Sequence, residues 1–205
     1  MNNNKRNGAI VCILAVLMLA GCGEAKVPEV VSDTSLAVAN DGTVTSYLVD
    51  KFDKEYYSIS DLTAMAVGEA AEYNTEHQSG ETIPLKVEKV EALSDGSNKV
   101  VVTHKYNSTE TYEDYNEAVL FYGTVTEAVN AGYQMDIILK GVKDGAIYTE
   151  EQLLQNADKH LLITDAKAVI YCPKRVAYIS DGAVYHEDGS VDASQAEGIV
   201  FLLMK

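Results

Sequence analysis

The chain has 205 residues, 47% of them hydrophobic, with 16 Lys and Arg residues against 31 Asp and Glu residues. This apolar content is enough for a sizeable core and argues against a disordered chain. The formal net charge of −15 argues against nucleic acid as a partner, because binding to phosphates depends on Lys and Arg. Such an acidic balance is typical of a solvated surface and also suits cationic partners.

Residues 1–21 have the layout of a secretory signal peptide. Lys5 and Arg6 precede an uncharged apolar run, residues 9–21, that ends in small residues. As a helix this run would span about 20 Å, against about 30 Å for the hydrocarbon core of a membrane. We therefore expect a targeting segment and not a membrane-spanning helix.

The run ends in the sequence LAGC, Leu19 to Cys22, which resembles the lipobox of bacterial lipoproteins. The resemblance implies that the Cys22 thiol receives a diacylglyceryl group and that cleavage leaves Cys22 as the first residue. It also implies export and attachment to the outer face of the cytoplasmic membrane, or to the outer membrane in a Gram-negative cell. The alternative is an ordinary secretory signal, cut nearby, with Cys22 left free.

The lipid on Cys22 is predicted to be the whole membrane anchor. Lys5 and Arg6 are the only basic residues before it, so 14 basic and all 31 acidic residues follow, with a net charge of −17. A stable anchor needs about two signals, and a diacylglyceryl group supplies two acyl chains. No polybasic segment adds an electrostatic signal, and an anionic membrane would repel the acidic domain.

Residues 22–41 are predicted to be a tether, and residues 42–205 a single globular domain. The tether segment contains small residues and Pro28 and shows no sustained periodicity. A first strand is expected at 43–49, after the turn signal Asp41-Gly42.

A helix and a hairpin are predicted next. Ser58 and Asp61 form a helix-capping pattern, and apolar residues then recur at helical spacing to about residue 76. Two alternating runs, 85–93 and 99–106, flank the turn sequence SDGSN and predict a β-hairpin.

Short helices and strands make up the rest of the predicted domain. Helix-capping patterns start with Ser108, Thr124 and Thr149, and Gly132 is expected to end the second of these helices. The C-terminal strands are expected at 161–164, 168–172, 175–180, 183–185 and 199–204. The pattern predicts an α+β fold, a mainly antiparallel sheet with two or three short helices and a mostly β C-terminal part.

The cysteines and histidines give no catalytic or metal-binding signature. Cys12 leaves with the signal and Cys22 is lipidated, so Cys172 is left without a disulfide partner. Cys172 precedes Pro173 in a predicted strand, which favours a buried structural thiol over a nucleophile. The four histidines are far apart, and His104 is expected to be a packed, hydrogen-bonded residue. No cofactor and no metal site are predicted.

Carboxylates cluster at several points of the sequence. On the predicted helix 109–117 four of them share one face, which is typical of a solvated surface. Paired carboxylates also cleave glycosidic bonds when a groove holds them about 5–10 Å apart. The sequence DGSVD, Asp188 to Asp192, offers oxygens to calcium but lacks the ligand spacing of an EF-hand loop.

The chain has 13 tyrosines, three phenylalanines and no tryptophan. Tyr112, Tyr115 and Tyr122 crowd together in TYEDYNEAVLFYG, beside carboxylates. Such rings stack on ligands and their hydroxyls form hydrogen bonds, so these three are candidates for binding a glycan, a peptide or a cationic ligand. The alternative is that they edge a small core.

Beyond Cys22 the chain resembles, in style, uncharacterised surface lipoproteins of Gram-positive anaerobes. The leading hypothesis is therefore a lipid-anchored, non-enzymatic binding or interaction domain at the envelope surface. One alternative is a cell-wall or glycan hydrolase that uses carboxylates, or Cys172 with a histidine. Another is a structural component of an envelope assembly.

Overall fold

The computed structural model describes residues 25–205, so the predicted signal peptide and Cys22 lie outside the described residues. Within this range the helices are α1 (Ile59–His77), α2 (Thr109–Asn116), α3 (Val125–Asn130) and α4 (Glu150–Gln155). Sheet A contains, in spatial order, β11 (Val184–Tyr185), β12 (Val191–Asp192), β9 (Val169–Tyr171), β1 (Ser35–Val38), β2 (Val44–Lys51), β4 (Lys99–Tyr106) and β3 (Leu85–Ala92). Sheet B contains β5 (Leu120–Thr124), β8 (His160–Thr164), β13 (Val200–Met204), β10 (Val176–Ile179), β6 (Leu139–Gly141) and β7 (Ile147–Tyr148).

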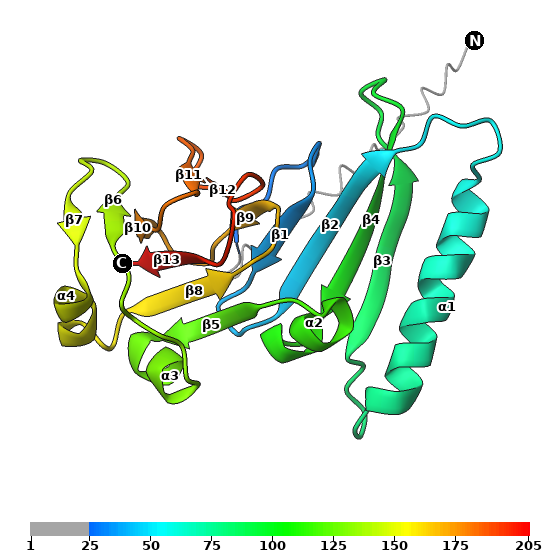
Figure 1. Cartoon of the computed structure of the whole chain (residues 1–205). Helices are drawn as coiled ribbons and strands as arrows, with labels where there is room; N and C mark the ends of the chain where they lie inside the picture. The colour runs from blue at the N-terminus through cyan, green and yellow to red at the C-terminus, as the bar shows by residue number, and fades with distance from the viewer. Residues whose placement is uncertain (1–24) are drawn as a thin grey trace, which may run out of the picture.

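The fold class agrees with the sequence prediction. All strand pairs of the two sheets are antiparallel except β1 with β9. Three short helices accompany the long α1, and from β8 onward strands are the only regular elements of the described chain (Figure 1). The predicted α+β fold with mainly antiparallel sheets is thus confirmed.

The N-terminal segment is the main departure from the sequence prediction. Residues 35–38 form β1, a central strand that pairs with both β2 and β9, and all four residues are buried. Val31 is also buried, at 8% exposed, and Thr34 Oγ1 bonds to the backbone of Val49 at 3.2 Å. The predicted tether over residues 22–41 was therefore wrong from Val31 onward, because a short strand buried on both faces has no polar alternation to reveal it.

The helix ends follow the predicted capping patterns. Ser58 Oγ accepts a hydrogen bond from Asp61 N at 3.3 Å at the start of α1. Complete capping boxes begin α3, through Thr124 and Glu127, and α4, through Thr149 and Gln152. These side chains pair backbone N–H groups that have no partner within the helix.

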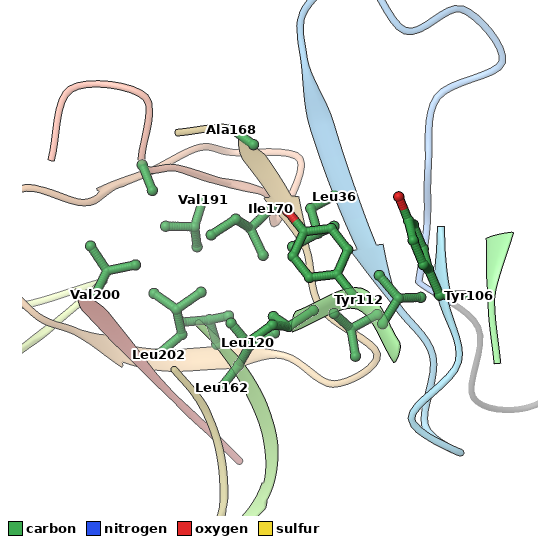
Figure 2. Packing of buried hydrophobic residues seen from close by; sticks show 14 of the residues in the cluster. Leu36, Tyr106, Tyr112, Leu120, Leu162, Ala168, Ile170, Val191, Val200 and Leu202 are labelled. Carbon is green, nitrogen blue, oxygen red and sulfur yellow. The ribbon is translucent and has the colours of Figure 1, made fainter. Parts of the chain in front are cut away.

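The inner face of sheet A packs against two different partners. At one end it faces sheet B, and Leu36, Ile170 and Leu202 meet there in a continuous apolar cluster (Figure 2). At the other end α1 and α2 cover β3 and β4, and α1 approaches through the small residues Ala66 and Ala70. A second apolar cluster lies between the opposite face of sheet B and the helices α3 and α4.

The outer face of sheet A carries the alternate residues of the same strands, because successive side chains point to opposite faces. Val169 and Tyr171 of β9 and Tyr47 and Val49 of β2 belong to this face. Residues 26–34 run across it before the chain enters β1. Lys26, Asp33 and Thr34 line the two hollows described below, and residues 27–31 line a third hollow beside Tyr47. The chain therefore approaches the fold from the predicted anchor on the outer face.

Candidate functional site

Tyr112 and Tyr115 belong to a cluster of six rings between α1, α2 and β4. Tyr112 packs edge-on against Tyr106 at a centroid distance of 5.2 Å, and Tyr115 meets Tyr73 in the same way, also at 5.2 Å. The remaining members of this ring cluster are His77 and His104. Tyr112 is only 9% exposed, and burial raises the pKa of its hydroxyl to about 12. Its ring therefore serves the core.

The exposed edge of the ring cluster is a hydrogen-bonded trio. Asp114 Oδ2 accepts from the Tyr73 hydroxyl at 2.8 Å and lies 3.2 Å from His77 Nε2. The rings of Tyr73 and His77 stack at 4.1 Å. Burial, with Asp114 adding to it, raises the pKa of Tyr73 to about 12. The trio joins α1 to α2, and Asp114 is thus not a freely solvated carboxylate as the sequence suggests.

The buried side of the ring cluster contains polar atoms without hydrogen-bond partners among residues 25–205. They are Ser46 Oγ, both ring nitrogens of His104 and the Tyr106 hydroxyl. His104 is 5% exposed, and burial lowers its pKa, which favours the neutral ring. His104 is packed, as predicted, but the expectation that it is hydrogen-bonded was wrong for the described part of the chain.

Tyr122 has different surroundings. Its ring packs on His160 at 5.4 Å, and its hydroxyl donates to Asn40 Oδ1 at 3.0 Å. Lys174 Nζ lies 2.9 Å from His160 Nδ1 and 3.1 Å from Nε2. Burial, and then the Lys174 charge, lower the pKa of His160. The structure therefore separates Tyr122 from the ring partners of Tyr112 and Tyr115.

Cys172 is partly buried, and burial raises the pKa of its thiol to about 12. Among residues 25–205 its sulfur has no hydrogen bond to any histidine. The thiolate is the nucleophilic form, so this surrounding opposes reactivity. The arrangement agrees with the predicted structural thiol.

The carboxylates of Asp188 and Asp192 in DGSVD accept hydrogen bonds from residues of the turns in which they lie. Asp188 Oδ1 accepts from the backbone N and the hydroxyl of Ser190 at 2.9 and 2.7 Å, and Asp192 Oδ1 accepts from Ser194 N at 2.8 Å. These bonds lower the pKa of both carboxyl groups. Over residues 25–205, no three His, Cys, Asp or Glu side chains are close enough together to hold a metal ion.

A polar hollow of about 530 Å³ opens on the outer face of sheet A, over β9, β12 and the end of β2. We call it the polar hollow. Its charged and aromatic lining comes from four parts of the sequence: Asp33, Lys99, Lys167, Tyr171, His186, Asp188 and Asp192. Lys99 Nζ donates to Ser32 O at 2.8 Å and lies 3.5 Å from Asp33 Oδ1, while Lys167 Nζ donates to Ala196 O. The lining of the polar hollow thus combines hydrogen-bond donors and acceptors with the apolar side chains of Val49 and Val169.

A second hollow of about 420 Å³ adjoins the first and shares Tyr171, Asp188 and Ser190 with it. We call it the basic hollow, because Lys26, Lys174 and Arg175 line it. Five of the 14 basic residues that follow Cys22 therefore lie along these two hollows. The carboxylates of Asp33, Glu187, Asp188 and Asp192 line the same hollows, so five cations face four carboxylates and the formal charge of the pair is positive by one. Such a mixture of charged donors and acceptors favours a hydroxyl-rich ligand.

Sequence reasoning missed both hollows. Their residues lie between Lys26 and Ser194, and no spacing in the sequence places Lys26 beside Arg175. The three predicted tyrosines, Tyr112, Tyr115 and Tyr122, line neither hollow. One signal was present in the sequence, because DGSVD places Asp188 and Asp192 close together. The sequence alone could not show whether these carboxylates bind a ligand or cap their own turns.

Comparison of the chain with protein-family models, with curated proteins and with solved structures finds no match.

Proposed function

We propose that the chain is a lipid-anchored domain of the bacterial envelope surface that binds a ligand without turnover. The LAGC sequence at Leu19–Cys22 and the short apolar run before it support the anchor. Among residues 25–205, no helix has the length and apolar character needed to cross a bilayer. Attachment would then depend on the lipid on Cys22.

The polar hollow supports the binding role, and it is the single observation that carries this proposal. Sugar hydroxyls both donate and accept hydrogen bonds, and the hollow offers Lys99 and Lys167 as donors beside Asp188 and Asp192 as acceptors. The partly exposed side chains of Val49 and Val169 add an apolar surface against which a sugar ring packs. A glycan of the envelope is therefore the ligand class that we propose.

The low reactivity of Cys172, the strongest candidate for a nucleophile, supports binding without turnover. The pKa of Cys172, about 12, leaves almost no thiolate at neutral pH. No described histidine is hydrogen-bonded to it, so the thiol has no general base. The carboxylates Asp33, Asp188 and Asp192 line the polar hollow and keep a glycan hydrolase as the rival hypothesis.

The ligand proposal is tested by calorimetric titration of the lipidated protein with soluble cell-wall oligosaccharides. Lys99→Gln removes a charged donor from the polar hollow, and we expect a loss of affinity of at least about tenfold from one charge-assisted hydrogen bond. Lys86→Gln, on exposed sheet surface outside the hollow, is the matched control and should bind as the native chain does. Absence of binding to every oligosaccharide would refute the glycan class, and release of new reducing ends would favour the hydrolase.

The anchor proposal is tested separately by mass spectrometry of the mature N-terminus. We expect a diacylglyceryl group on Cys22 and membrane release of a Cys22→Ala variant. An unmodified Cys22 would refute the anchor, whatever the result for the oligosaccharides.

A further inference from the structure

The basic hollow lies beside the point where the chain arrives from the predicted anchor. Its walls are Lys26, the segment Cys172–Arg175 between β9 and β10, and the turn Tyr185–Ser190 between β11 and β12. Lys26 follows Cys22 by four residues, which span at most about 14 Å when fully extended. A lipid on Cys22 therefore keeps this hollow within reach of the membrane headgroups.

The charges of the basic hollow favour an anion. Among residues 25–205, no carboxylate lies within ion-pair distance of Lys26, Lys174 or Arg175. Two carboxylates, Glu187 and Asp188, also line the hollow, so its formal charge is positive by one. Asp188 already accepts two hydrogen bonds from Ser190, which partly satisfy its negative charge.

The phosphate group matches this set of donors. A guanidinium binds phosphate oxygens through two parallel N–H bonds, and ammonium groups add point charges. Lys174 Nζ is also held by the neutral ring of His160, at 2.9 Å from Nδ1, and this contact leaves the positive charge of the ammonium without a carboxylate partner among residues 25–205. Three cations from two distant parts of the sequence thus converge on a volume of about 420 Å³.

We infer that the basic hollow binds the phosphate of an anionic phospholipid headgroup next to the lipid anchor. This inference rests on the proposed anchor at Cys22. It revises the sequence expectation that the lipid acts alone: the net charge after Cys22 is −17, but the hollow beside the anchor has a formal charge of +1.

The test uses the lipidated protein in vesicles of phosphatidylcholine alone or with roughly 30% phosphatidylglycerol, an anionic lipid that gives the vesicle surface a negative potential. Amide hydrogen exchange is measured by mass spectrometry on peptides that cover 171–175 and 185–190. We expect slower exchange in these peptides only in the anionic vesicles. Exchange that is equal in both vesicles, with the protein anchored in both, would overturn the inference and leave the anchor intact.

Charge variants then test the residues. Each cation near an anionic surface changes the ratio of docked to undocked protein by about fivefold, so Lys174→Gln with Arg175→Gln should lower that ratio about 25-fold. Lys86→Gln with Lys105→Gln is the matched control, since it removes the same charge from exposed positions on the same sheet face. An equal loss in both double variants would overturn a specific hollow.

Two further outcomes separate the sources of failure. If inorganic phosphate without vesicles slows exchange in the same peptides and anionic vesicles do not, the hollow binds free phosphate and the lipid inference is wrong. If the protein fails to float with vesicles of either composition, the proposed anchor itself fails. Circular dichroism of each variant confirms that it is folded before exchange is measured.

Discussion

The buried ring of His104 predicts a specific loss of stability in mildly acidic solution. It lies opposite Ser46 in the pairing of β2 with β4 and beside Tyr106, at a centroid distance of 6.2 Å. Neither ring nitrogen has a hydrogen-bond partner among the described residues, and burial lowers the pKa of the ring. The native state therefore resists protonation, whereas the unfolded chain, with a histidine pKa of about 6.5, accepts a proton.

The sign and size of the effect follow from this difference. Between the two pKa values the unfolded state binds more protons, so the free energy of unfolding falls as the pH falls below about 6.5. For a ring that stays neutral in the native state, the loss at pH 5.5 is about 1.4 kcal/mol relative to pH 8. The pKa of His160 is also lowered, by burial and by Lys174, and it adds to the loss in the same direction.

Urea unfolding at pH 8 and pH 5.5 measures the contribution of His104. His104→Gln removes the titrating ring, so this variant should lose less stability than the native chain between the two pH values, by up to about 1.4 kcal/mol. His186→Gln, at an exposed position of the turn after β11, is the control and should lose as much as the native chain. Equal losses in the native chain and in His104→Gln would refute the claim that burial keeps this ring neutral.

The remaining predictions concern the core, the thiol and a helix cap. Leu36→Ala should lower the free energy of unfolding by about 2–5 kcal/mol in urea, because this leucine is 1% exposed in β1. Val30→Ala, at a position that is 55% exposed, is the control and should cost less than about 0.5 kcal/mol. Equally small losses in both variants would contradict the burial of β1 in the fold. At one pH, Cys172 of the folded protein should react with a maleimide about a thousandfold more slowly than after unfolding, since its thiol pKa is raised from 9.0 to about 12, and rapid native labelling seen by peptide mass spectrometry would contradict this. Glu127→Ala removes the acceptor that lies 2.7 Å from Thr124 N and should lower the free energy of unfolding by about 0.5–1 kcal/mol at pH 7. Because hydrogen bonds from Thr124 lower the pKa of Glu127, the native chain and the variant should converge in stability as the pH falls below about 4, and a constant gap in acid would contradict the cap.

Local signals predicted most of the secondary structure. The hairpin of β3 and β4 agrees within one residue with the predicted runs, because both strands alternate and a turn sequence separates them. The caps at Ser58, Thr124 and Thr149 formed because a side-chain oxygen three residues from a free N–H needs no tertiary context. Such features depend on a few neighbouring residues and can therefore be predicted from the sequence.

The strand β1 and the two hollows could not be predicted in this way. β1 has four residues, and its place in the sheet depends on β9, which lies more than 130 positions further along the chain. The hollows depend on which face of sheet A the segment 26–34 crosses, and tertiary packing decides that. The tyrosines were conspicuous in composition, yet Tyr112 fills the core, since an aromatic ring gains more from burial than from exposure.

The two hollows share a wall, so their occupants should influence one another. Tyr171, Asp188 and Ser190 line both, and a phosphate in the basic hollow would place negative charge beside any ligand in the polar hollow. An anionic glycan should therefore bind more weakly on anionic vesicles than on neutral ones, while a neutral glycan should bind equally well on both. By thermodynamic linkage the anionic glycan should also lower the affinity of the basic hollow for the phosphate by the same factor. Calorimetry of the lipidated protein on the two vesicle types measures this coupling, and affinities that do not depend on vesicle charge would show that the hollows act independently.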